Sequence, residues 1–116
     1  MTGIVIGDAP LTIADVVAVA RGGAEVTLGR AARGRIAAAH DVIAAVIANE
    51  QVAYGVTTGF GQLATTHIPV DNVRELQENL VRSHAVCVGE PLSREVVRAA
   101  MTIRLNTIAR GHSGVR

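Results

Sequence analysis

Aromatic side chains are almost absent from this sequence: its 116 residues include one tyrosine, one phenylalanine and no tryptophan. Hydrophobic residues still make up 49% of the chain, and most of them are alanine or valine. Because aromatic side chains bury the largest area per residue, a chain of this composition forms thin contacts between helices. Such surfaces suit close packing against something else. We therefore expect the chain to belong to a larger assembly.

Lysine, clustered positive charge and long apolar runs are also missing. All 11 basic residues are arginines, scattered among 10 acidic residues, and the net charge is +1. Nucleic-acid binding requires a clustered basic face and usually stacking aromatic rings. The apolar run 42–49 is too short to cross a bilayer, and the uncharged stretch 51–70 is interrupted by glycines, threonines and Pro69. The sequence therefore predicts neither a nucleic-acid partner nor a membrane span.

The single cysteine, Cys87, excludes a disulfide within the chain. A free cysteine fits a reducing compartment, which favours a cytoplasmic location. The first residues contain Asp8 and no basic segment, so they do not resemble a signal peptide. No pair of histidines or acids has a zinc-ligand spacing such as His-Glu-x-x-His, so we predict no metal site.

The pattern of apolar residues predicts a mainly α chain. The β-branched segment 3–7 is read as a strand or an extended arm, and 25–28 as a brief extended piece. Helices are expected from Thr12 to the glycines at 22–23, over 30–48, from Asp71 to 84, and from Ser93 to 111. Thr12 and Asp15 have the spacing of a capping box, and Asp71 and Ser93 are expected to cap their helices.

Residues 54–61, Tyr-Gly-Val-Thr-Thr-Gly-Phe-Gly, interrupt the helical pattern with three glycines: Gly55, Gly59 and Gly61. This segment is therefore a loop, and it holds the only tyrosine, Tyr54, and the only phenylalanine, Phe60. A phenol has an ordinary pKa near 10, so it acts as a base only where its surroundings stabilise the phenolate. Glycines let the backbone approach a ligand and let a loop open and close. The alternative is a glycine-rich turn with an ordinary half-buried tyrosine.

Ser83 and His84 stand at the broken end of the third predicted helix. A histidine there could titrate near neutral pH or hold a polar ring. The alternative is a helix C-terminal histidine that is satisfied by carbonyl groups and the helix dipole. Cys87 lacks a base at a telling distance, so a spectator thiol is the better interpretation.

Three blocks in matching order resemble one known family. Residues 54–61 resemble the tyrosine loop of the aromatic amino-acid ammonia-lyases and aminomutases. Residues 76–84, Leu-Gln-Glu-Asn-Leu-Val-Arg-Ser-His, and 89–92 are similar to the helix and loop that follow it, and 104–116 are similar to the next family block. The resemblance covers essentially the whole chain. It implies that 1–116 form the N-terminal portion of a helical-bundle lyase with a glycine-rich tyrosine loop.

The resemblance also implies a chemistry. Family members eliminate ammonia from an aromatic amino acid with 4-methylidene-imidazol-5-one, which forms from an internal Ala-Ser-Gly. Tyr54 matches the base that removes the β-proton, and Ser83 and His84 match a pair beside the substrate ring. The Ser-His pair and 109–116 are most similar to the histidine-specific branch, which converts L-histidine to urocanate and ammonia. A tyrosine ammonia-lyase or aminomutase is the alternative within the family, and a non-catalytic remnant or partner subunit is the alternative outside catalysis.

Two departures from the family pattern qualify these expectations. The chain contains no Ala-Ser-Gly, which the family places beyond this block. Family members are several times longer and assemble as homotetramers, so the segment is expected to be a truncated piece that is inactive alone. Cys87 also occupies a position where glycine is expected. If that position needs a positive φ, a Cβ there is costly.

Overall fold

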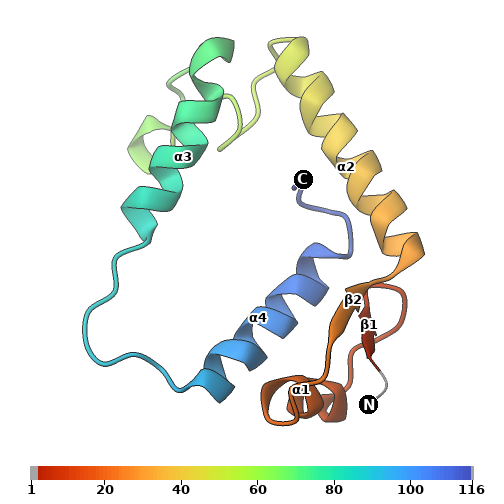
Figure 1. The fold of residues 1–116 in the computed structure, drawn as a ribbon. Helices are drawn as coiled ribbons and strands as arrows, with labels where there is room; N and C mark the ends of the chain where they lie inside the picture. Colours follow the sequence, from red (N-terminus) through yellow and green to blue (C-terminus); the bar gives the residue numbers. More distant parts are fainter. Residues whose placement is uncertain (1–2, 116) are drawn as a thin grey trace. The chain divides into compact units, whose positions relative to one another are not determined.

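The computed structural model describes residues 3–115, and these residues divide into two compact units. The first unit comprises 3–41 and 90–115, and the second comprises Val42–Gly89. Over the described residues the chain forms four α-helices and two short strands, which confirms the mainly α prediction (Figure 1). The helix α2, Arg30–Ala48, has the predicted bounds and continues from the first unit into the second. None of the helices in the described part is long and apolar enough to cross a membrane.

The first unit contains a parallel strand pair. The strands β1, Ile4–Ile6, and β2, Val26–Leu28, lie side by side, with Ile4 opposite Val26 and Ile6 opposite Leu28 (Figure 1). Parallel strands need a crossover connection, and the helix α1, Ile13–Ala20, lies within that connection. Both predicted extended segments are therefore strands.

The predicted capping box starts α1. The Thr12 hydroxyl accepts a hydrogen bond from the backbone N–H of Asp15 at 3.2 Å. The Asp15 carboxylate in turn accepts from the Thr12 hydroxyl at 2.6 Å and from the Thr12 N–H at 2.9 Å. These bonds to Thr12, the hydroxyl first, hold the pKa of Asp15 below its ordinary value of 3.8.

The N-terminus of α2 is capped from a distance. The Asp8 carboxylate accepts from the backbone N–H groups of Ala32 at 2.8 Å and Ala31 at 3.4 Å. A Cβ on Gly29 would lie 2.2–2.4 Å from that carboxyl group, so the close approach of Asp8 requires a glycine. The segment after β1 is thereby fixed to the start of α2.

The helix α4, Arg94–Ile108, packs against α1. The Arg98 guanidinium donates to the carbonyl oxygen of Val19 at 2.9 Å. Ser93 is the predicted N-cap, and its hydroxyl accepts from the Val96 N–H at 3.4 Å. The buried apolar side chains of this unit are all aliphatic, and three of the five are alanine: Ile6, Val19, Ala24, Ala32 and Ala109. An open groove of about 740 Å³ remains, lined mainly by apolar side chains of β1, β2, α2 and α4.

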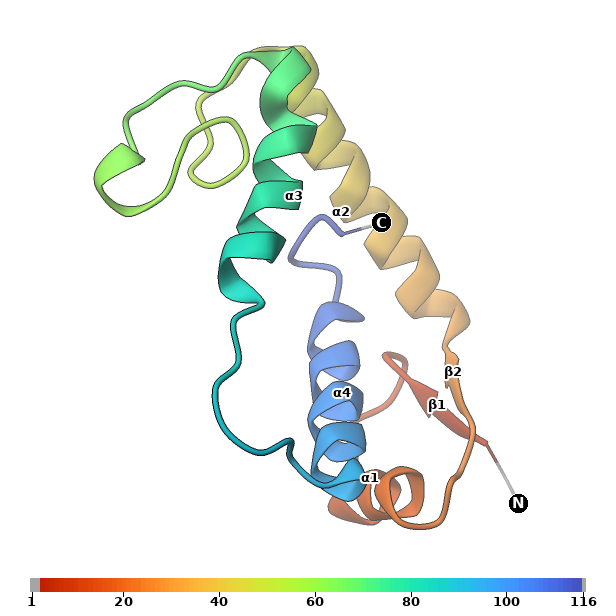
Figure 2. The ribbon, with the colours of Figure 1, turned by 60° about the vertical axis from the view of Figure 1, so that its left-hand side comes forward.

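The second unit is built around the helix α3, Val73–His84. A 3₁₀ turn, Val70–Asn72, precedes α3, and another, Gly61–Leu63, lies in the loop before it (Figure 2). The prediction that Asp71 caps this helix is wrong, because Asp71 lies inside the 3₁₀ turn and the N-cap is Asn72, without a side-chain cap. Pro69, with φ −55°, starts this turn, and its carbonyl accepts from the Asn72 N–H at 2.9 Å. The extra turn moves the helix start past Asp71.

Candidate active site

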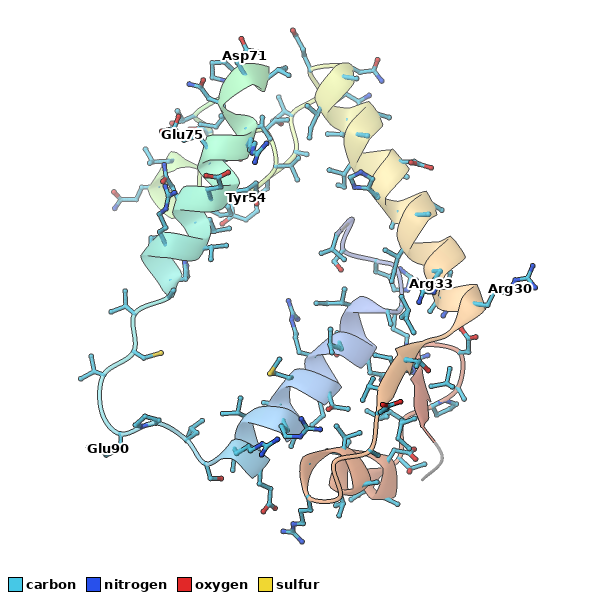
Figure 3. The ribbon with its side chains drawn as sticks, viewed as in Figure 1. Arg30, Arg33, Tyr54, Asp71, Glu75 and Glu90 are labelled. Atoms are coloured by element: carbon cyan, nitrogen blue, oxygen red, sulfur yellow. The ribbon has the colours of Figure 1, made fainter. Side chains whose placement is uncertain are left out.

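Tyr54 lies on the loop that connects α2 and α3. The backbone from Ala53 to Thr57 makes one helical turn, because the Ala53 carbonyl accepts from the N–H groups of Val56 and Thr57, each at 3.0 Å. The Tyr54 side chain is 66% exposed, and Figure 3 shows it on the loop beside α3. Its phenol group is therefore accessible to a ligand rather than half-buried in a turn.

The loop folds back on Tyr54. The rings of Tyr54 and Phe60 meet edge to face, with centroids 5.9 Å apart and an interplanar angle of 78°. The backbone N–H of Gly61 donates to the phenol oxygen of Tyr54 at 3.4 Å. The only two aromatic residues of the chain therefore contact each other, and a backbone donor helps to fix the phenol oxygen.

Each of the three loop glycines stands where the backbone conformation or the available space disfavours a side chain. Gly55 has φ +71°, and a Cβ there would lie 2.8 Å from the Phe60 ring. Gly61 has φ +56°, a conformation that side chains disfavour. Gly59 has no room for a Cβ, which would lie 2.6 Å from the Leu63 Cβ. The glycines thus allow one closely packed loop shape.

Two adjacent threonines, which sequence reasoning missed, form the buried interior of the loop. Thr57 and Thr58 are each 1% exposed. The Thr57 hydroxyl accepts from the Ala53 N–H at 2.9 Å and donates to the Gln51 carbonyl at 2.7 Å. The Thr58 hydroxyl accepts from the Gly55 N–H at 3.2 Å and donates to the Gly59 carbonyl at 3.0 Å. The available signal was a pair of threonines in a glycine-rich loop, since such hydroxyls bond readily to nearby backbone.

A side chain of α3 holds the same loop from outside. The Gln77 amide donates to the carbonyl oxygen of Gly55 at 2.8 Å, although the two residues are 22 positions apart. No local pattern predicts this contact, because it depends on how the loop returns to the helix. Through this hydrogen bond, α3 is attached to the loop at the residue that follows Tyr54.

Ser83 and His84 are exposed and lie in the last turn of α3. The Ser83 hydroxyl donates to the Leu80 carbonyl at 2.9 Å. The His84 Nδ1 lies 2.9 Å from the same oxygen and 3.1 Å from the Ser83 hydroxyl. The histidine is thus satisfied by a carbonyl of its own helix, as the local alternative proposed, and its ring orientation is set by that contact.

The two parts of the candidate site are both attached to α3, and no direct interaction joins them in the described part of the chain. Within residues 3–115, no hydrogen bond or aromatic contact joins Tyr54 to Ser83 or His84. His84 stands seven residues after Gln77, which is about 10 Å along a helix. The structure therefore places the ring-binding candidate in the last turn of α3 and the base candidate on the loop that Gln77 attaches to the same helix.

Cys87 does not occupy a backbone position that requires glycine. Among the non-glycine residues that the structure describes, Glu50 alone has a positive φ, so the Cβ of Cys87 causes no strain of that kind. The positive φ in this segment, +99°, is at Gly89. The Cys87 thiol is free and exposed. Over the same described residues, no group of three or more potential ligands could hold a metal ion.

Comparison with known proteins gives these features a family. Residues 11–116 match the family model described as aromatic amino acid lyase. The chain is 48% identical to histidine ammonia-lyase of Streptomyces avermitilis and 50% identical to that of Streptomyces griseus, each over 116 residues. These matches cover 100% of this chain but 23% of each relative, so the chain spans less than a quarter of their length.

Solved structures agree with the sequence matches. Tyrosine aminomutase from Streptomyces globisporus superposes with a TM-score of 0.93 at 32% identity, over 99% of this chain and 22% of that one. Histidine ammonia-lyase from Trypanosoma cruzi gives a TM-score of 0.87 at 38% identity, over 99% and 22%. The block 104–116 ends at Arg116, which lies outside the described residues. With its family model matched over nearly all of its length, the chain belongs to the aromatic amino acid lyase family.

Proposed function

We propose that this chain is the N-terminal segment of a histidine ammonia-lyase, which converts L-histidine to urocanate and ammonia. The observation that carries the proposal is the 48–50% identity, along the entire chain, to proteins named histidine ammonia-lyase. The loop with Tyr54 and the Ser83–His84 pair lie within that match. The same resemblance supports 1–116 as one N-terminal part of a lyase domain, a homotetramer whose active sites draw on several subunits, and a cytoplasmic location.

Tyr54 is the proposed catalytic base. Elimination removes a proton from the carbon β to the amino group, and the electrons of that C–H bond form the double bond as the C–N bond breaks and ammonia leaves. The exposed phenol oxygen of Tyr54 would accept the proton, and the Gly61 N–H and the Phe60 ring hold the phenol in place. A base must be fixed within hydrogen-bond reach of the proton that it takes.

The cofactor implied by the family has no source in this chain. The 4-methylidene-imidazol-5-one group would supply the electrophile that activates the amino group as a leaving group. It derives from Ala-Ser-Gly, and no Ala-Ser-Gly occurs among the 116 residues. The residues present therefore fit the roles of base and of ring recognition but not that of cofactor precursor. The chain alone is accordingly proposed to be inactive.

His84 and Ser83 are the proposed contacts to the substrate ring. A carbonyl oxygen only accepts hydrogen bonds, so the contact to Leu80 assigns the proton of the neutral imidazole to Nδ1. The Nε2 atom is then an acceptor, and it has no hydrogen-bond partner among residues 3–115. An acceptor at this point suits the N–H of a substrate imidazole.

A second candidate, a tyrosine aminomutase or ammonia-lyase, is favoured by the superposition on tyrosine aminomutase with a TM-score of 0.93. A phenol O–H would also donate to Nε2 of His84. The sequence identity favours histidine, at 48% against 32%. A non-catalytic subunit that binds longer relatives is the candidate outside catalysis, and the absence of Ala-Ser-Gly is its support.

A chimera tests these candidates. The matching segment of the Streptomyces griseus histidine ammonia-lyase would be replaced by this chain. We expect the assembled chimera to convert L-histidine, with urocanate followed by its ultraviolet absorbance, and to act poorly on L-tyrosine and L-phenylalanine. The unmodified relative is the control. Turnover of L-tyrosine in preference to L-histidine would favour the second candidate, and a soluble, assembled but inactive chimera would favour the non-catalytic one.

A further inference from the structure

We propose that Thr57, Thr58 and Gln77 form a clamp that positions Tyr54, and that they are positioning residues for the elimination. The inference rests on the proposed function for the role of Tyr54 as base. The clamp itself is a structural feature that can be measured without any activity.

The clamp holds the backbone on both sides of Tyr54. The Thr57 hydroxyl accepts a hydrogen bond from the N–H of Ala53, the residue before Tyr54, at 2.9 Å. The Thr58 hydroxyl accepts a hydrogen bond from the N–H of Gly55, the residue after Tyr54, at 3.2 Å. The carbonyl oxygen of Gly55 accepts a hydrogen bond from the Gln77 side-chain amide at 2.8 Å. Rotation of the Tyr54 backbone would therefore break at least one of these bonds.

The two hydroxyls are themselves fixed. Each donates its own proton to a loop carbonyl, Thr57 to Gln51 at 2.7 Å and Thr58 to Gly59 at 3.0 Å. Their backbone is paired on the other side, because the Ile68 N–H donates to the Thr57 carbonyl at 2.9 Å and Thr58 forms an antiparallel bridge with His67. A side chain without a hydroxyl would leave a loop N–H without its acceptor. The requirement is thus for a hydroxyl, which serine also provides.

This arrangement separates proton removal from substrate binding. The clamp acts on the Tyr54 backbone, whereas Ser83 and His84, the proposed ring contacts, are held by Leu80 near the C-terminal end of α3. A loosened loop would misplace the phenol oxygen and leave the ring contacts unchanged. Loss of the clamp should therefore lower kcat with little change in KM.

The first experiment uses the 116-residue chain and amide hydrogen exchange. Thr57→Val and Thr58→Val each remove one hydroxyl at nearly constant volume, Thr57→Ser and Thr58→Ser keep it, and Gln77→Met removes the exposed amide. Thr65→Val is the matched control, because Thr65 is exposed and makes no side-chain hydrogen bond among the described residues. We expect exchange at Ala53 in Thr57→Val, and at Gly55 in Thr58→Val, to rise on the order of tenfold. The serine variants and the control should match the parent.

The second experiment measures kinetics in the chimera. We expect the valine variants to lose up to about 10²-fold in kcat, since a displacement near 1 Å has that cost, while KM for L-histidine stays close to the parent value. Serine should restore kcat. Loss of amide protection in α3 would show that a valine variant had unfolded. The kcat of Gln77→Met, a substitution at an exposed position, would then decide whether the clamp affects proton removal.

The outcomes separate the clamp from the proposed function. An inactive chimera would count against the proposed function alone, because the exchange experiment reads the clamp directly. The clamp is overturned if the parent loop shows no protection at Ala53 and Gly55, if the valine variants exchange like the parent, or if a loosened loop leaves kcat unchanged.

Discussion

The ring of Tyr54 meets the ring of Phe60 edge to face, with centroids 5.9 Å apart, so the proposed base is held by its apolar ring as well as by its backbone. A phenylalanine at position 54 can keep this contact, because only the phenol oxygen is lost. The same substitution removes the acceptor for the Gly61 N–H. Position 54 therefore allows proton transfer to be tested apart from packing.

Tyr54→Phe in the chimera should reduce kcat for L-histidine at least about 10²-fold, the lower end of what general acid–base catalysis contributes. Substrate binding should change little, since the proposed ring contacts lie in the last turn of α3, away from the loop that carries Tyr54. Steady-state kinetics measure the effect, and Thr65→Val, on an exposed loop residue without a side-chain hydrogen bond in the described part of the chain, is the control. A kcat within a few-fold of the parent would make Tyr54 a structural loop residue.

His84→Phe should impair recognition rather than proton removal. The variant loses the nitrogen acceptor at the end of α3, so KM for L-histidine should rise more than kcat falls. L-phenylalanine should become a better substrate relative to L-histidine. The comparison needs kcat and KM for both amino acids, with His84→Gln, which retains a polar side chain, beside it. An unchanged preference would place the substrate ring away from His84.

The chain alone should produce no urocanate from L-histidine. Tyr54 can take a proton only when the amino group is activated as a leaving group, and the chain has no Ala-Ser-Gly from which to form the activating group. Ultraviolet absorbance of purified chain with L-histidine checks this, with the chimera as positive control. Sustained turnover would contradict the proposed division of roles.

Acidification should open the start of α1 at a pH set by Thr12. The pKa of Asp15 is lowered by its hydrogen bonds to Thr12, so its contribution is fully present above the unfolded value of 3.8 and is lost as the pH falls through the lower folded value. Thr12→Ala should move the folded pKa of Asp15 back toward 3.8, and Thr12→Ser should not. Carbon-detected NMR of the Asp15 carboxyl group measures the midpoint. Identical midpoints in all three proteins would show that the hydroxyl does not matter.

The isolated chain should self-associate through α4. Val97, Met101 and Leu105 recur at a spacing of four residues and are 41%, 58% and 46% exposed, so they form an apolar stripe. Exposed stripes of this kind favour association. Sedimentation velocity over a range of concentrations should show larger species, and Met101→Glu should reduce them, whereas Arg104→Gln, on an exposed neighbour, should not. A monomer at every concentration would refute this.

Local signals predicted the helices well. Thr12 with Asp15, and Ser93 with Val96, are contacts across three residues, and both occur as the spacing indicated. The cap that Asp8 provides for α2 was missed because it spans 23 and 24 residues. Asp71 was misassigned because a 3₁₀ turn after Pro69 precedes the helix proper.

The candidate site was predicted in its residues but not in its support. The glycine pattern identified the loop and Tyr54, while the buried hydroxyls of Thr57 and Thr58 are ordinary in sequence and become significant only once the loop closes on them. The contact of Gln77 with Gly55 depends on tertiary structure and leaves no trace in periodicity. Resemblance to a family supplied roles for the site residues, and the structure supplied the contacts that hold them.

The division of the chain into units has a consequence for the order of folding during synthesis. The second unit is continuous, Val42–Gly89, whereas the first needs α4 to return to α1, as in the bond from Arg98 to Val19 across 79 residues. During synthesis the loop and α3 leave the ribosome before α4 does. Closing the longer loop costs more chain entropy and must wait for the later residues. The segment that carries Tyr54 and His84 is therefore expected to complete its contacts first, while α1 waits for α4, which leaves the ribosome later.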